Sequence, residues 1–354
     1  MNRHTIREAL TKPRFSILSV GLPVFAVLVI IVLQNAPMLT SLTSSTLAVP
    51  TKQQTLPILV NELLAHTDPP QKDTVELYNP NDQPVNIGGW YLSDAFDKPK
   101  KFKIAASTVV PARGYLLLDP DDFDLNARFI FSAEGEEVYL FAADAAGRLT
   151  GYYHGFSFGA STNGVSFGRH TTSTGEEVFA VQSALTLGGP NSEPQVGPIV
   201  ISAIVHDPQK SGFAIELTNI TTATVPLFDP AVPANTWHIS GKGDFALPTG
   251  LTLGPKGALW VVAGEPADFR SAHGIADAVQ IVGDYAYPPS GSGAKLTLAK
   301  PDPPNQNGVV PYVEVDVVGF SDTMPAQNKT AEKVTLRRLK LWGYGNDPAN
   351  WNHE

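Results

Sequence analysis

The chain has 354 residues and no cysteine, so disulfide bonds, thiolate catalysis and cysteine-based metal sites are excluded. With 43% hydrophobic residues, 30 glycines and 30 prolines, it reads as a turn-rich globular protein long enough for about two domains. The net charge is −9, and residues 1–14 contribute +3, so the remaining −12 argues against binding to nucleic acid, which needs clustered lysine and arginine.

Residues 15–33 form an uncharged apolar stretch of 19 residues, long enough as a helix to cross a bilayer core of about 30 Å. A buried helix is the alternative, but the basic flank at 1–14 favours membrane insertion with that flank in the cytoplasm. Residues 34–55, rich in Ser, Thr, Pro and Ala, are predicted to form a stalk or linker. Ala48 ends a candidate cleavage site about fifteen residues past the apolar run, a distance that favours an uncleaved signal anchor over a secreted product.

From Leu56 on, short hydrophobic runs alternate with turn residues. Val138 and Leu140 alternate with Glu137 and Tyr139, a two-residue period that predicts strands with one buried face. Breakers such as residues 79–82 and 111–114 are closely spaced, so antiparallel hairpins are the natural connections. The basic run at residues 98–103 is predicted to be a charged edge strand. We expect an Ig-like antiparallel β-sandwich over residues 56–193.

Two serines in the first half match the Gly-x-Ser-x-Gly pattern of hydrolases. Ser157 lies in residues 155–159 and Ser166 in residues 164–168. A hydrolase needs its serine on a sharp turn from a strand into a helix, whereas Phe, Val, Ser and Gly alternate here as in strands. We therefore predict that neither serine is catalytic and that the protein is not an enzyme.

Four aspartates follow one another closely at Asp119, Asp121, Asp122 and Asp124, as in a calcium loop. An EF-hand requires glycine where Asp124 stands and glutamate where Ile130 stands, so that motif is excluded. The sequence leaves open whether these aspartates ever contact calcium. The histidines lack the paired spacing of a zinc site, and we predict no metal and no cofactor; they are His66, His154, His170, His206, His238 and His273.

The second half repeats the first in a weaker form. The segment Val75-Glu76-Leu77-Tyr78-Asn79-Pro80 returns as Ala214-Ile215-Glu216-Leu217-Thr218-Asn219, and the tryptophan of residues 88–92 returns in residues 235–240. Residues 194–198 form a short proline-flanked linker, and residues 199–354 are predicted to form a second sandwich.

Matching residues of the two halves suggest structural roles. Trp90 and Trp237 are predicted to be core anchors, because a sugar-stacking tryptophan would need aromatic neighbours on its own face. Tyr91 points to the face opposite Trp90. Glu76 and Glu216 are expected to share a task such as accepting backbone hydrogen bonds where a strand bends.

The second half also carries its own decorations. A short helix is predicted at residues 266–273, with Gly274 placed to end it. Two long polar turns, residues 288–293 and 300–308, lie where a sandwich carries binding specificity.

The order of these motifs resembles the bacterial lamin-tail domain. The resemblance rests on the Asn-Glu strand at 58–64, the Glu-Leu-Tyr-Asn-Pro strand, the Gly-Gly-Trp-Tyr-Leu strand and the closing Gly188-Gly189-Pro190-Asn191. The second copy is divergent, and its ending at residues 334–351 recovers the likeness. The family implies a binding or targeting role.

We therefore expect a membrane-tethered, non-catalytic protein that displays two tandem lamin-tail-like sandwiches outside the cytoplasmic membrane. Its expected partner is a protein or another component of the cell envelope. The alternative is an accessory subunit that directs a separate secreted hydrolase to a carbohydrate or protein substrate. Ligand identity, oligomeric state, cleavage of the leader and the orientation of the two sandwiches stay open.

Overall fold

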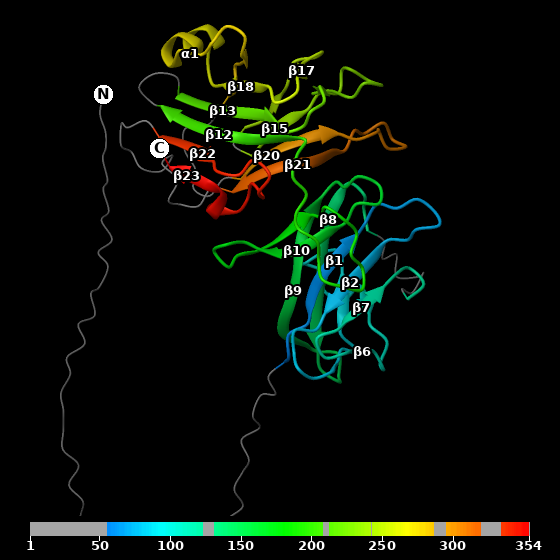
Figure 1. Cartoon of the computed structure of the whole chain (residues 1–354). Helices are drawn as coiled ribbons and strands as arrows, with labels where there is room; N and C mark the ends of the chain where they lie inside the picture. Colours follow the sequence, from blue (N-terminus) through cyan, green and yellow to red (C-terminus); the bar gives the residue numbers. More distant parts are fainter. Residues whose placement is uncertain are drawn as a thin grey trace, which may run out of the picture. The chain divides into compact units, whose positions relative to one another are not determined.

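The computed structural model of the chain describes residues 55–122, 131–207, 212–241, 243–286, 295–319 and 334–353. The predicted signal anchor at 15–33 lies outside these residues. Within the described part, no helix has the length and apolar character needed to span a membrane. Nearly all the regular secondary structure of the described residues is β-strand, as the sequence predicts (Figure 1).

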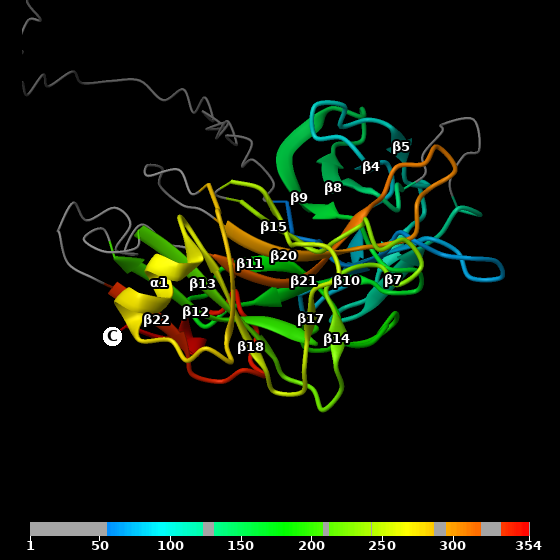
Figure 2. The ribbon, with the colours of Figure 1, turned by 90° about the horizontal axis from the view of Figure 1, so that it is seen from above.

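The first sandwich consists of strands β1 to β11. One of its sheets is ordered β11 (Glu177–Val181), β10 (Phe167–Thr171), β1 (Leu59–Leu64), β2 (Thr74–Tyr78) and β7 (Tyr115–Leu118). The other is ordered β5 (Phe102–Lys103), β4 (Tyr91–Ser93), β8 (Gly135–Ala143) and β9 (Leu149–Gly159), which Figure 2 shows together. A small ribbon pairs β3 (Val85–Asn86) with β6 (Val109–Val110).

The second sandwich consists of strands β12 to β23. Its larger sheet is ordered β19 (Gln280–Val282), β18 (Ala258–Val262), β13 (Gly212–Asn219), β12 (Ile199–Asp207), β22 (Val334–Arg338) and β23 (Trp351–His353). The facing sheet is ordered β16 (Phe245–Ala246), β15 (His238–Ser240), β20 (Lys295–Pro301) and β21 (Tyr312–Gly319). A ribbon pairs β14 (Val225–Pro226) with β17 (Thr252–Leu253), and a 3₁₀ turn covers Pro348–Asn350.

Each sandwich has its own apolar core between its two sheets. In the first, Val60 and Leu77 of one sheet join Leu92 and Leu140 of the other in one buried cluster, and Trp90 belongs to it. The second core is built in the same way, with Trp237 inside it. Both tryptophans are core anchors, as predicted. No sheet among the described strands mixes residues from before and after the 194–198 segment.

The repeated asparagines are both fully buried. Asn79 directly follows β2, and Asn219 is the last residue of β13. Each side-chain amide nitrogen lies within hydrogen-bond distance of three backbone carbonyl oxygens. One belongs to the residue four positions on, and the other two lie at the start of the turn before the neighbouring strand. Each side-chain oxygen also accepts the backbone N–H two residues on. The repeated asparagine therefore closes the same turn pair in both sandwiches.

In both sandwiches, the strand that pairs with the asparagine's strand is preceded by a residue in the left-handed backbone conformation. Arg113 has φ 52° and Lys256 has φ 55°, and each is followed by glycine. The backbone N–H of Asn79 donates to the carbonyl of Gly114, and that of Asn219 donates to Gly257. Two residues other than glycine in this uncommon conformation, at matching positions, place the same turn in both halves.

The single α-helix of the described chain, α1 (Pro266–His273), belongs to the second sandwich and ends at Gly274 with φ 62°, as predicted. Its Phe269 packs with Ala203, Ala214 and Trp260 in a separate apolar cluster. Since these three residues lie on β12, β13 and β18, α1 covers the outer face of the larger sheet (Figure 1).

Candidate functional site

Two buried carboxylates lie opposite each other on β1 and β2. The pairing of these strands shifts between Val60 and Glu62, so Asn61 forms a β-bulge. Glu62 and Glu76 are register partners, and both are fully buried. Burial raises the pKa of Glu76. Two buried acids are costly unless hydrogen bonds satisfy them, so the partners of these carboxylates decide their role.

Both carboxylates bind one segment, residues 183–193, which we call the closing segment. Glu62 accepts the Thr186 N–H at 3.0 Å and the Thr186 hydroxyl at 2.7 Å. Glu76 accepts the Gly188 N–H at 2.5 Å and the Asn61 amide at 2.7 Å. These contacts are structural, and the predicted role of Glu76 as an acceptor of a backbone hydrogen bond is confirmed.

Ser166 belongs to the same buried centre. It is 1% exposed, and its hydroxyl donates to Glu62 at 2.6 Å and accepts from the Gln182 amide at 3.3 Å. Ser157 lies within β9, and Ser166 directly precedes β10. Neither serine sits on a turn into a helix. The predicted strand setting is confirmed for Ser157, whereas Ser166 lies one residue before a strand.

The second sandwich repeats the bulge with different side chains. The pairing of β12 with β13 shifts between Ile201 and Ala203, so Ser202 is the bulge residue and Ala203 lies opposite Glu216. Glu216 accepts the Ser202 hydroxyl at 2.9 Å and lies 3.7 Å from Arg337. No backbone N–H donates to Glu216 among the described residues, so the expected shared task holds for Glu76 only. The outer face of this sheet is covered by α1 rather than by a closing segment.

The bulged strand of each sandwich donates one N–H to the facing sheet. Val60 N donates to Nδ1 of His154 at 2.9 Å, and Ile201 N donates to Oδ2 of Asp316 at 2.8 Å. His154 pairs with Leu140, and Asp316 pairs with Leu298, at the matching place of each core. A histidine and an aspartate therefore perform the same structural task.

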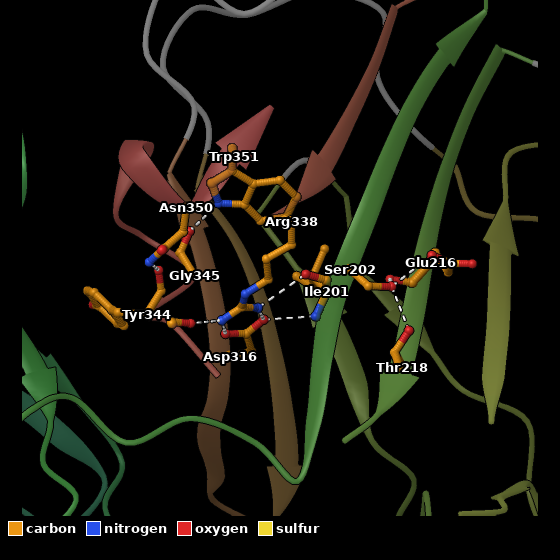
Figure 3. A network of polar contacts seen from close by, with 11 residues as sticks. Ile201, Ser202, Glu216, Thr218, Asp316, Arg338, Tyr344, Gly345, Asn350 and Trp351 are labelled. Atoms are coloured by element: carbon orange, nitrogen blue, oxygen red, sulfur yellow. Dashed lines mark hydrogen bonds and ion pairs between the residues drawn. The ribbon is translucent and has the colours of Figure 1, made fainter. Parts of the chain in front are cut away.

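Asp316 forms a buried ion pair with Arg338 (Figure 3). The guanidinium Nη1 lies 2.5 Å from Oδ2 of Asp316, and Nη2 lies 3.2 Å from Oδ1. Nη1 also donates to the carbonyl of Ile201 at 3.1 Å, and Nη2 donates to that of Gly343 at 2.5 Å. Burial raises the pKa of Asp316, and Arg338 opposes that shift. The pair ties the last strands to the bulge of β12.

His154 gives the first sandwich a predicted pH dependence. Its Nδ1 can accept the Val60 N–H only while unprotonated, and burial lowers the pKa of His154 although Glu177 at 3.4 Å raises it. The histidine's contribution is complete above its unfolded pKa of about 6.5 and is lost as pH falls from there through the lower folded pKa. We expect the unfolding free energy to fall over this window by about 0.5–1.5 kcal/mol, the net value of one hydrogen bond.

The matched control for this prediction is His154→Gln, whose amide oxygen can accept the same N–H and does not titrate. Amide hydrogen exchange of β1 in the full-length chain, followed from pH 7.5 to 5, should show a steeper loss of protection in the wild type. Equal slopes in both proteins would contradict the assignment.

Two of the described aspartates of the turn at 119–122 contact a lysine. Asp119 and Asp121 both contact Lys72, whose ammonium already supplies a cation there. Asp124 lies outside the described residues. Among the residues that are described, no group of three His, Asp or Glu side chains could hold a metal ion.

An aromatic surface lies on the outer face of the β5-β4-β8-β9 sheet; we call it the aromatic face. Register places Lys103, Tyr91, Phe141 and Tyr153 in one row across the four strands. Side chains of register partners project from the same side of a sheet. Tyr91 is thus directed away from the core, as predicted.

Phe96 lies over the neighbouring rings of this face. Its ring centroid is 5.1 Å from that of Tyr139, 5.7 Å from that of Phe141 and 5.0 Å from that of Tyr153. Phe96 is 44% exposed and Tyr153 is 51% exposed, while Phe141 is buried beneath them. Gly155, the register partner of Tyr139, leaves room for the tyrosine ring, because a Cβ there would lie 2.5 Å from it.

The same row in the second sandwich carries no Phe, Tyr or Trp, and its one ring, His238, stacks on Tyr312 with ring centroids 4.0 Å apart. Ala246, His238, Ala299 and Glu314 are register partners across β16, β15, β20 and β21. The inward row, by contrast, is alike in both sandwiches: Phe102, Leu92 and Leu140 in the first correspond to Phe245, Ile239 and Leu298 in the second. The fold therefore needs the inner row and does not need the aromatic outer row.

Each sandwich also carries an open cavity lined by other residues. One of about 270 Å³ in the first sandwich is polar and is lined by Tyr78, Tyr115, Arg169 and the end of the closing segment. One of about 310 Å³ in the second is lined by Trp237, Phe228, Pro301 and Pro303 among others. The predicted specificity turn at 300–308 thus borders a cavity, whereas residues 288–293 lie outside the described chain.

Comparison with known proteins identifies part of the chain. Residues 51–155 match the model of the Lamin Tail Domain family. Neither the curated proteins nor the solved structures give a match. The matched range ends within β9, yet β10 pairs with β1, so the sheet of the first sandwich continues past it.

Proposed function

We propose that this chain, which carries a lamin tail domain over residues 51–155, is a membrane-tethered binding protein without catalytic activity of its own. It displays two lamin-tail-like, Ig-like sandwiches outside the cytoplasmic membrane, the second being a divergent copy of the first. The aromatic face carries the binding part of this proposal, because Phe96 and Tyr153 are exposed in the first sandwich and the matching row of the second has Ala246, His238, Ala299 and Glu314 instead.

The divergent-copy proposal is supported by matching devices in both sandwiches. The bulges at Asn61 and Ser202 occupy the same place, and so do the turn-closing Asn79 and Asn219. These features involve backbone geometry at several separate positions, which two unrelated sandwiches would not share at the same order and spacing.

The absence of catalysis is supported by the use of the buried polar groups. Glu62, Ser166 and the Asp316–Arg338 pair hold strands and segments together and have no access to solvent. A serine-reactive fluorophosphonate probe should label neither Ser157 nor Ser166 in the folded full-length chain. Labelling of either serine would contradict the proposal.

Tethering can be tested by cysteine labelling, because the natural chain has no cysteine. Asp97→Cys places one thiol on an exposed turn of the first sandwich, and Arg3→Cys places one on the basic flank. In intact cells, a membrane-impermeant maleimide should label the first variant and should label the second only after permeabilisation. The reverse pattern, or loss of the protein from the membrane fraction, would refute tethering.

The accessory-subunit alternative is favoured by the cavity beside Trp237 in the second sandwich, which is lined mainly by proline and aromatic residues. Purification of the full-length chain from envelope extract separates the two. Repeated recovery of one hydrolase, lost on Phe228→Ala, would favour the accessory role.

A further inference from the structure

The row on the aromatic face has the dimensions and rigidity of a stacking platform. Neighbouring strands are about 4.8 Å apart, so the side chains of Tyr91, Phe141 and Tyr153 repeat across the sheet at that interval. The rings hold one another at fixed angles, with Phe96 at 75° to Tyr153. Ordered rings lose little side-chain entropy on binding, and tyrosine hydroxyls offer polar contacts beside an apolar surface.

Lysines without carboxylate partners border the rings. The ammonium of Lys100 lies 5.5 Å from the centre of the Tyr91 ring and donates to the carbonyl of Gly147. Lys103 ends the row, and Lys98 is exposed on the adjoining turn. Among the described residues, no Asp or Glu forms an ion pair with these three lysines.

The acidic residues near the face offset these charges only in part. Asp94 is paired with Lys101 and Asp144 with Arg148. Glu137 accepts the backbone N–H of Phe96 at 2.7 Å and keeps its negative charge, and Asp97 is exposed beside Lys98. Three lysines thus stand against two carboxylates without a cationic partner, Glu137 and Asp97, so the face keeps an excess of one positive charge on a chain whose residues 15–354 carry −12. This excess suits a partner with negative charge.

We infer that the aromatic face binds an anionic polysaccharide, with sugar rings stacked on Tyr153, Phe96 and Tyr91 and acidic groups paired with Lys98, Lys100 and Lys103. This inference rests on the proposed binding function and names its ligand class. Several exposed rings on one face of a sheet suit a chain of sugar units, and lysines bordering those rings suit acidic groups on that chain. In the second sandwich, Ala246 and Glu314 at the row's ends would remove one charge contact and repel another.

The test uses the full-length chain in nanodiscs of zwitterionic lipid and three soluble probes. Alginate carries sugar rings and carboxylates, dextran carries sugar rings alone, and polyglutamate carries carboxylates alone. Isothermal titration at low salt should show alginate binding at least roughly tenfold more tightly than either of the others. Tyr153→Glu and Lys103→Ala, which install the residues of the second sandwich, should each weaken alginate binding by roughly tenfold.

Glu314→Gln, at the place in the second sandwich that matches Tyr153, is the matched control and should leave alginate binding unchanged. Tyr153 and Lys103 are exposed, so we expect the variants to unfold thermally like the wild type. That result shows that the fold is intact. Equal binding of polyglutamate and alginate, equal binding of dextran and alginate, or variants that bind like the wild type would overturn the inference.

Preferential sedimentation with phosphatidylserine vesicles over alginate, abolished by the same variants, would also overturn the inference and point to a lipid surface instead. Failure of the cysteine-labelling pattern would remove the tether, whereas failure of alginate binding with that pattern intact would remove only the ligand class.

Discussion

Full-length Arg338→Met is expected to lower the unfolding free energy of the second sandwich by about 3–5 kcal/mol, the usual cost of removing one member of a buried ion pair. The change leaves Asp316 4% exposed with the Ile201 N–H as its remaining hydrogen-bond donor. Urea unfolding monitored by tryptophan fluorescence measures this sandwich, because it holds four of the chain's five tryptophans: Trp237, Trp260, Trp342 and Trp351.

The double variant Asp316→Leu, Arg338→Met removes both charges and should regain part of the lost stability, since an apolar pair replaces an ion pair at little cost. It will not regain all of it, because the Ile201 N–H then lacks its acceptor. Arg148→Met, which breaks the exposed pair with Asp144, should leave the transition unchanged. A single Arg338→Met variant that unfolds with the wild type would contradict the role of the pair.

The strand content and the repeat could be predicted from the sequence because both depend on local signals. Alternation around Val138 and Leu140 identified β8, and the turn residues at 79–82 marked the end of β2. The helix at 266–273 was likewise local, with proline at its start and glycine at its end. Glu216 does not perform the task predicted for it. The strand sequence could not show this, because the segment that covers the outer face of a sheet is distant in sequence from its strands.

The matching tasks of His154 and Asp316 could not be predicted, because the two side chains differ in chemistry. They share only the task of accepting a backbone N–H from the bulged strand. The aromatic face was missed for a related reason. Tyr139 alternates with buried residues and was assigned to the solvent side, which is correct, but strand pairing alone brings it beside Phe96 and Tyr153. The aromatic residues at alternate positions of 139–141, with Tyr91 facing away from Trp90, were the available signal.

The first sandwich depends most on Glu62, because one carboxylate there holds two distant segments. Glu62→Ala leaves the Ser166 hydroxyl and the Thr186 N–H without their acceptor, and it leaves the Thr186 hydroxyl only the side-chain oxygen of Gln182 at 3.4 Å. Each buried polar group left unpaired costs about 1–3 kcal/mol, so we expect a loss of about 3 kcal/mol or more. The residue of the second sandwich that matches Glu62 is Ala203. Alanine suits that position because Phe269 of α1 packs over it.

The decisive measurement is peptide-resolved amide hydrogen exchange of the full-length chain. In Glu62→Ala, exchange should accelerate in residues 183–193 and in β1, while β12 and β13 keep the protection of the wild type. Glu62→Gln retains an acceptor oxygen and the side-chain shape, so it should lose less, and the difference between the two variants measures the acceptor itself. Because the closing segment is also held by Glu76 through Gly188 and by Asn191 through Asn61, its protection should fall without vanishing. Unchanged exchange across residues 183–193 in Glu62→Ala would mean that Glu62 does not hold the closing segment on the sheet.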